Sequence, residues 1–158
     1  MKTLVLGIGN TLLSDEGVGV HVVRALQSRS ASLFPEVEFL DGGTLSFTLA
    51  GPIEDADALI VVDAAQMDEV PGTMRIYEGE EMDRFLLSRR KASAHEVGLA
   101  DLMTIATLSD HWPVRRALVA IQPEKLDWGE EPTPAVAAAV GEASHRIESL
   151  IGAWRHAA

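Results

Sequence analysis

Three acidic residues of this sequence stand where side chains in an α/β protein often do chemistry. Glu16 lies in a glycine-rich turn soon after a short apolar run, and Asp41 and Asp63 each directly follow another apolar run. If these runs are neighbouring parallel strands, their carboxyl ends meet at one edge of a sheet, where ligands of such folds bind. We therefore expect the three acids to converge.

Each acid taken alone is also compatible with a structural role. Glu16, or its neighbour Asp15, could favour the positive end of the following helix, a contribution of about 0.3–1 kcal/mol. Asp41 precedes two glycines and could stabilise a turn, whereas Asp63 could cap a helix. Three acids gathered at one sheet edge, however, repel one another, so a cation, shared protons or a basic substrate is needed to stabilise them.

His95 is the candidate fourth member of this site. Ser93 and Glu96 flank it with the spacing of a capping box, so Glu96 is expected to cap a helix over 97–106 rather than to act as a catalyst. His95 would then lie in the first helical turn, where the helix dipole disfavours the imidazolium. That position favours the neutral ring that a metal ligand requires.

Glu16, Asp63 and His95 would together supply two oxygen ligands and one nitrogen ligand with open coordination positions. This donor set suits Ni, Zn, Fe or Mn. A lone histidine on a helix more often has a structural role, and it is the nearby acids that make His95 a candidate ligand. The remaining histidines have no such context and are interpreted as surface or packing residues: His21, His111, His145 and His156.

Strands and helices alternate along the chain and would position these residues. The apolar runs predict five strands, over 3–6, 37–40, 58–62, 73–77 and 115–122. Between them, Val18, Val22 and Leu26 recur on one helix face, and a short helix is expected from Thr44 until Gly51-Pro52 stops it. The last helix is expected to be capped by Thr133, to begin at Pro134 and to bury an apolar stripe: Val136, Val140, Ile147, Leu150, Ile151 and Trp154.

This alternation predicts an α/β fold, a three-layer α/β/α sandwich with a mostly parallel sheet of about five strands. The 158 residues, 47% of them hydrophobic, suit a single domain over 1–158. A net charge of −11 argues against binding to nucleic acid, and the absence of cysteine excludes disulfides and thiolate sites. The first apolar run is too short for a signal sequence or membrane insertion, so we expect a cytoplasmic protein.

Several familiar catalytic motifs are excluded by their spacing. His95-Glu96 begins like the metalloprotease motif H-E-x-x-H, but Leu99 stands where the second histidine is required. The glycines at 7–12 lack the third glycine of a dinucleotide-binding loop, and no P-loop follows the first strand. A serine hydrolase is also disfavoured, because the sequence has no G-x-S-x-G elbow.

The sequence motifs resemble those of the endopeptidases that mature nickel-iron hydrogenases. The resemblance spans nearly the whole chain in the right order, in G-I-G-N-T-L-L-S-D-E-G-V-G-V at 7–20, D-G-G-T at 41–44, V-V-D-A at 61–64, S-A-H-E-V-G-L at 93–99 and I-Q-P at 121–123. It implies an endopeptidase that removes the C-terminal extension of a hydrogenase large-subunit precursor after nickel insertion. No organic cofactor is implied, and we expect a monomer when the protein is free.

By the same resemblance, Glu16, Asp63 and His95 match the family's metal-contacting trio, and Asp41 matches an acid needed for cleavage. The nickel is expected to be supplied by the bound precursor. Two other functions are compatible with the same residues: a stand-alone metal-dependent amide hydrolase, and a nonenzymatic metal carrier or assembly chaperone. The first would turn over small amides, whereas the second would bind a precursor without changing its mass.

Overall fold

The computed structural model describes residues 1–89 and 98–157. Its strands are β1 (Thr3–Ile8), β2 (Val37–Gly43), β3 (Ala58–Ala64), β4 (Met74–Glu78) and β5 (Arg115–Ile121). Its α-helices are α1 (Val18–Ser30), α2 (Ala50–Asp55), α3 (Glu80–Ser88), α4 (Leu99–Leu108) and α5 (Pro134–Ala157). Two 3₁₀ turns, η1 (Ser14–Gly17) and η2 (Phe47–Leu49), precede α1 and α2.

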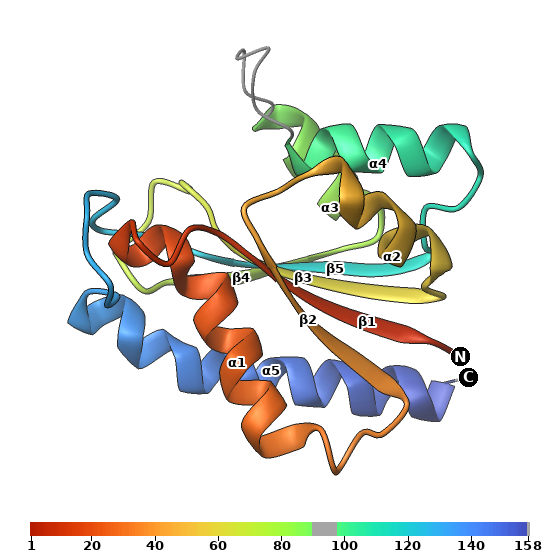
Figure 1. The fold of residues 1–158 in the computed structure, drawn as a ribbon, viewed down its shortest axis with the longest axis horizontal. Coiled ribbons are helices and arrows are strands. Elements are labelled where there is room, and N and C mark those ends of the chain that lie inside the picture. Colours follow the sequence, from red (N-terminus) through yellow and green to blue (C-terminus); the bar gives the residue numbers. More distant parts are fainter. Residues whose placement is uncertain (90–97, 158) are drawn as a thin grey trace.

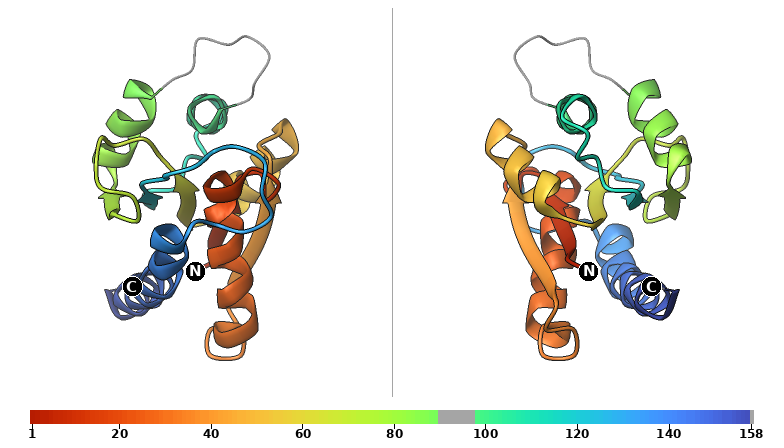
Figure 2. Two further views of the ribbon diagram at one scale, coloured as in Figure 1. Left: turned by 90° about the vertical axis from the view of Figure 1, so that its left-hand side faces the viewer. Right: turned by 90° about the vertical axis from the view of Figure 1, so that its right-hand side faces the viewer.

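The five strands form one sheet in the order β2-β1-β3-β5-β4. All neighbouring strands are parallel except β4, which runs antiparallel to β5. Helices α1 and α5 cover one face of the sheet, and α2, α3 and α4 cover the other (Figures 1 and 2). The predicted α/β/α sandwich with a mostly parallel sheet is thereby confirmed.

The central strands were recognisable in the sequence because they are buried on both faces. Alternate side chains of a strand point to opposite faces, so a strand covered on both sides is apolar throughout. In β3, Ile60 packs in the core beneath α1 and α5, whereas Leu59 and Val61 pack in the core beneath α2, α3 and α4. The sheet therefore separates two hydrophobic cores.

Two predicted helix boundaries differ from the observed ones, and one predicted helix cap has another role. Helix α2 runs through Gly51-Pro52 instead of stopping there, because Pro52 is its third residue, where a helix has no acceptor for the missing N–H. Helix α4 begins at Leu99 rather than at 97, with the extended Gly98 as its N-cap. Helix α5 begins at Pro134 as predicted, but the hydroxyl of Thr133 donates to Asp15.

The long helix α5 buries much of the predicted apolar stripe. Val136 and Ile147 are fully buried, and Trp154 is nearly so, against the face of the sheet that α1 also covers. Among the helices of residues 1–89 and 98–157, none combines the length and the apolar character needed to cross a membrane.

Helix α1 approaches the strands closely at Gly19. A Cβ atom added there would lie 2.1 Å from the carbonyl oxygen of Val62 and 2.6 Å from that of Ile8. Only a residue without a side chain permits this contact, which holds the start of α1 against the carboxyl ends of β1 and β3. The glycine therefore sets the position of η1, the turn that carries Glu16 directly before α1.

We expect Gly19→Ala to lower the free energy of unfolding by about 2–3 kcal/mol, because the added methyl group forces α1 away from backbone atoms. Gly141→Ala in α5 is the matched control, since a Cβ there meets no atom within 4 Å. The control should raise stability by up to about 1 kcal/mol through helix propensity alone. Urea unfolding of both variants measures the difference, and equal effects would contradict the proposed close contact.

Candidate functional site

A cavity of about 680 Å³ opens at the carboxyl ends of β1 and β3. The chain leaves β1 for β2 on one side and continues from β3 towards β5 on the other, so the strand order reverses between β1 and β3. Such a switch point leaves a crevice where ligands of open α/β sheets bind. The described part of the cavity is lined by η1 and the segments that follow β1, β2, β3, α3 and β5, together with the start of α4.

Glu16 lines this cavity from η1. Its Oε2 accepts a hydrogen bond from the backbone N–H of Asn10 at 2.5 Å, and the side chain of Asn10 in turn accepts from the N–H of Leu12 at 2.9 Å. Gly9 makes the turn possible, because a Cβ there would lie 2.0 Å from the carbonyl oxygen of Glu16. The glycine-rich segment after β1 is thus a compact turn that fixes the Glu16 carboxylate.

Asp63 lines the same cavity from the end of β3. It follows Leu59 and Val61 in the alternation of the strand and so takes the face covered by α2, α3 and α4. Its side is therefore set by the same period of two that buries those apolar residues. Glu16 and Asp63 are brought together as predicted.

Asp41 lies on the opposite face of the sheet. It pairs in register with Gly7, which pairs on its other side with Val62, a residue of the core beneath α1 and α5. The exposed Asp41 carboxylate is 3.2 Å from the guanidinium of Arg24 in α1 and accepts from the N–H of Gly43 at 2.9 Å. The structure therefore brings two of the three acids to the cavity and places Asp41 outside its lining.

The predicted fourth member, His95, and its flanking Ser93 and Glu96 lie outside the described residues. The described start of α4 supplies a different acid, Asp101, which lines the cavity. Asp101 accepts a hydrogen bond from the N–H of Gly98 at 2.8 Å and so caps the helix. The sequence did not indicate this role, because the Ser-x-x-Glu pattern at 93–96 is the more typical helix cap and comes earlier in the chain.

A family model of hydrogenase maturation proteases, HycI, matches residues 20–150. The hydrogenase 2 maturation protease of Escherichia coli K12 is 39% identical over 157 residues, which cover 98% of this chain and 92% of that protein. The chain belongs to the hydrogenase maturation protease family. HupD of Rhizobium leguminosarum bv. viciae, a hydrogenase expression/formation protein, is 36% identical over 97% of this chain and 75% of its own length.

Solved structures agree with this family assignment. The hydrogenase maturating endopeptidase HybD of Escherichia coli superposes with a TM-score of 0.83 at 36% identity, covering 99% of this chain and 94% of that chain. HybD of Thermococcus kodakarensis shares the fold, with a TM-score of 0.73 at 24% identity over 95% of this chain and 99% of that chain. This maturation protease is therefore a peptidase.

Two carboxylates in one cavity give the protease oxygen donors that can contact a metal ion or take a proton from water. Glu16 and Asp63 fit the oxygen half of the predicted donor set. Within residues 1–89 and 98–157, no three histidine, aspartate or glutamate side chains are placed to hold a metal ion together. The predicted nitrogen donor, His95, is not among those residues.

Asp15, next to Glu16, is a fully buried carboxylate of the protease that sequence analysis took for a possible helix-end charge. Its Oδ2 accepts from the N–H of Glu124 at 2.9 Å, the N–H of Lys125 at 3.0 Å and the hydroxyl of Thr133 at 2.8 Å. Its Oδ1 accepts from the N–H of Thr133 at 2.6 Å. One carboxylate thus ties η1 to both ends of the segment 124–133 that follows β5.

These hydrogen bonds control the ionisation of Asp15. Burial by itself raises the pKa of the carboxyl, but the N–H groups of Lys125, Glu124 and Thr133 and the Thr133 hydroxyl together hold the pKa below its usual value. Asp15 is therefore a carboxylate at neutral pH, and four donors depend on that charge.

Gln122 organises a second wall of the cavity of the maturation protease. This buried side chain accepts from the N–H of Met67 at 2.7 Å and donates to the side-chain oxygen of Gln66 at 2.7 Å. Gln66 and Asp63 both line the cavity. The glutamine of the I-Q-P motif therefore fixes the loop that follows Asp63, a role that its place at a strand end did not reveal.

We expect Asp15→Asn to lower the free energy of unfolding of the maturation protease by about 3 kcal/mol, because an amide NH₂ must then face an N–H donor. Asp127→Asn on the same segment changes an exposed side chain and should remain within about 0.5 kcal/mol of wild type. Urea unfolding at pH 7 measures both effects.

The same comparison repeated at lower pH tests the charge of Asp15. Because its folded-state pKa is lowered, the stabilisation is fully present above the unfolded value of about 3.9 and is lost as the pH falls through the folded-state pKa. The difference between wild type and Asp15→Asn should therefore shrink only in acid. A difference that stayed constant down to pH 2 would show that the carboxylate charge is not what stabilises this contact.

Proposed function

We propose that this chain is the endopeptidase that removes the C-terminal extension of a nickel-iron hydrogenase large-subunit precursor after nickel insertion. The placement of Glu16 and Asp63 on one cavity at the switch point of the sheet carries this proposal. It is supported by 39% identity, over 98% of the chain, to a hydrogenase 2 maturation protease. We further propose that the protein acts in the cytoplasm as a monomer.

In this proposal the nickel ion belongs to the substrate. Glu16 and Asp63 offer it carboxylate oxygens from η1 and β3, and His95 is the proposed third contact. The hydrogen bond from Asn10 holds one oxygen of Glu16 in place, so the carboxylate is already oriented before the precursor arrives. The nickel site of the precursor would thereby be held beside the peptide bond that is cleaved.

The proposed chemistry is attack of a water molecule on the scissile carbonyl. A carboxylate takes a proton from the water as the carbon–oxygen bond forms, and the proton passes to the leaving amine as the carbon–nitrogen bond breaks. Asp41 is the proposed base, as the sequence motif implies. Its position beside Arg24 requires the end of β2, at 41–43, to bring the carboxylate to the cavity when the precursor is bound.

We expect Glu16→Gln, Asp63→Asn and His95→Ala each to lower precursor processing at least about hundredfold, because each removes a metal contact. The measurement is the mass of a purified large-subunit precursor, with and without nickel, before and after addition of the chain. Wild type should remove a C-terminal peptide from the nickel-loaded precursor only. Circular dichroism should show that the three variants remain folded.

Other results of this experiment would support other functions. Precursor binding without a change of mass would indicate a metal carrier or assembly chaperone. Turnover of small amides with a metal bound tightly to the free chain would indicate a stand-alone hydrolase. Normal processing by all three variants would eliminate the proposed site.

The role of Asp41 is tested by comparing it with its ion-pair partner. We expect Asp41→Asn to lower the cleavage rate at least about hundredfold, as loss of a general base does. Arg24→Gln should retain the rate within about fivefold, because an exposed ion pair contributes at most about 1 kcal/mol. Equal losses in both variants would instead mean that Asp41 acts by holding the end of β2 in place through Arg24.

A further inference from the structure

Four large apolar side chains are exposed beside the cavity. Leu126 and Phe47 line it from different segments, with exposed fractions of 52% and 62%. Leu12 and Trp128, exposed by 50% and 77%, lie on neighbouring segments, because the N–H of Gly129 donates to the carbonyl of Leu12 at 2.9 Å. We call Leu12, Leu126 and Trp128 the apolar lip. Phe47 is not part of the lip and lies at another part of the cavity lining.

The segment that carries the lip is held by its backbone. Besides the hydrogen bonds to Asp15, the Ser14 hydroxyl donates to the carbonyl of Asp127 at 2.8 Å, and the Ser14 N–H donates to that of Gly129 at 2.8 Å. The apolar side chains therefore stand on a fixed backbone while exposed to water. A preformed surface of this kind loses little conformational entropy on binding, and exposed apolar patches with a polar rim typically mark interaction sites.

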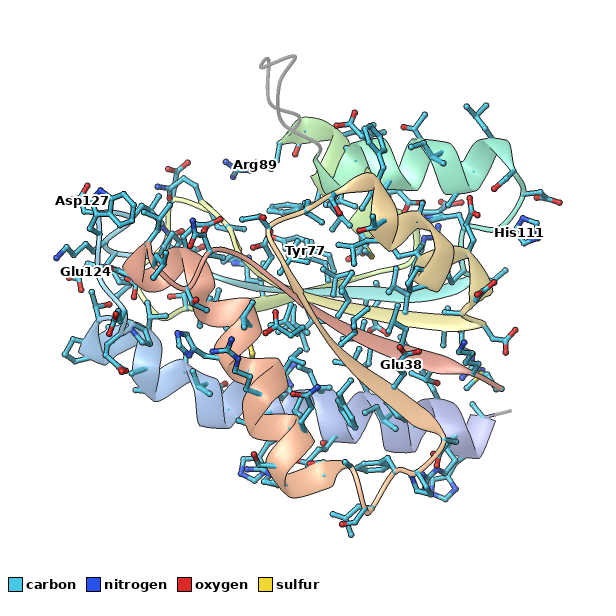
Figure 3. The ribbon with its side chains drawn as sticks, viewed as in Figure 1. Glu38, Tyr77, Arg89, His111, Glu124 and Asp127 are labelled. Atoms are coloured by element: carbon cyan, nitrogen blue, oxygen red, sulfur yellow. The ribbon has the colours of Figure 1, made fainter. Side chains whose placement is uncertain are left out.

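The lip has an acidic border. Four exposed acids and one exposed lysine lie in the segment, namely Glu124, Asp127, Glu130, Glu131 and Lys125. Figure 3 shows Glu124 and Asp127 at the outer edge of this loop, away from the sheet. The surface therefore complements a polypeptide segment that carries apolar side chains next to lysine or arginine.

We propose that the apolar lip and Phe47 bind the hydrogenase large-subunit precursor through an extended segment adjoining the cleaved bond, an inference that rests on the proposed function. Apolar side chains of that segment pack on Leu126, Trp128 and Phe47, and a basic side chain faces Glu124 and Asp127. The surface is continuous with the cavity, because Leu126 and Phe47 belong to both. Holding the chain beside the cavity places the scissile bond near the carboxylates, and the contact contributes equally to the ground state and the transition state, so it acts on KM rather than on kcat.

The double variant Leu126→Ser/Trp128→Ser tests the apolar contact. It should raise KM for a nickel-loaded precursor about tenfold or more and leave kcat within about twofold, as loss of at least 1.4 kcal/mol of binding does. The matched control is Leu108→Ser/Val114→Ser, which changes two side chains exposed by 84% and 86% at the end of α4 and just before β5. The control should leave both constants unchanged.

The double variant Glu124→Gln/Asp127→Asn tests the charge contact. It keeps the main-chain bonds to Asp15 and Ser14, so the segment stays in place. It should raise KM at low salt and make KM less dependent on ionic strength, because exposed charges are screened by salt. An unchanged KM and salt dependence would overturn the proposed basic side chain of the precursor segment.

A binding measurement separates this inference from the proposed function. Precursor binding to Glu16→Gln, with and without the lip substitutions, is measured by surface plasmon resonance. If wild type binds but never cleaves, and the lip substitutions abolish binding, the docking surface stands and the endopeptidase proposal fails. If wild type cleaves and the lip variant cleaves with unchanged KM, the docking surface is wrong. A precursor that neither binds nor is cleaved overturns both.

Discussion

The buried carboxylate of Asp15 is the interaction on which the geometry of the cavity depends. It joins the turn that carries Glu16 to the segment after β5 that contributes Pro123 and Leu126 to the cavity lining. Besides those hydrogen bonds, the two walls are connected by the N–H of Asp15, which donates to the carbonyl of Lys125, by the Ser14 contacts and by the link between Leu12 and Gly129. A buried charge is tolerated there because four donors replace the water it lost. The two adjacent acids thus have different roles: Asp15 is buried and stabilises the structure, whereas Glu16 lines the cavity.

The site is also a consequence of how the sheet is wound. Strands β1 and β3 are parallel neighbours, so the residues that follow them emerge at the same edge, and Gly19 lets α1 sit directly above that edge. Strand β4, antiparallel at the far end, contributes no residue to the described lining of the cavity. The cavity of this peptidase therefore lies at the parallel part of the sheet, where a strand is followed by a helix.

The strands, the layers and the shared location of Glu16 and Asp63 could be predicted from the sequence. Buried parallel strands are apolar runs, and their carboxyl ends lie at one edge of the sheet. The face of the sheet on which Asp41 lies depends on the register of β2 against β1, in which Asp41 pairs with Gly7. A local sequence pattern does not contain this register. The role of Asp15 escaped for a similar reason, since its partners come 109 to 118 residues later in the chain. Helix α4 begins at Leu99, two residues later than predicted, because Gly98 and Asp101 cap it there.

The segment 124–133, whose two ends are hydrogen-bonded to the Asp15 carboxylate, is anchored almost entirely by its main chain. The hydrogen bonds that anchor it use backbone N–H and carbonyl groups of Glu124, Lys125, Asp127 and Gly129. Within the segment, only Thr133 adds a side chain to these bonds. Side chains at 126–128, 130 and 131 can therefore be exchanged without loosening the loop or moving Glu16, whereas a Cβ at Gly129 would lie 2.5 Å from the hydroxyl oxygen of Ser14. The main chain of this loop is therefore a fixed support, and its exposed side chains can vary and change the surface beside the cavity while Glu16 stays in place.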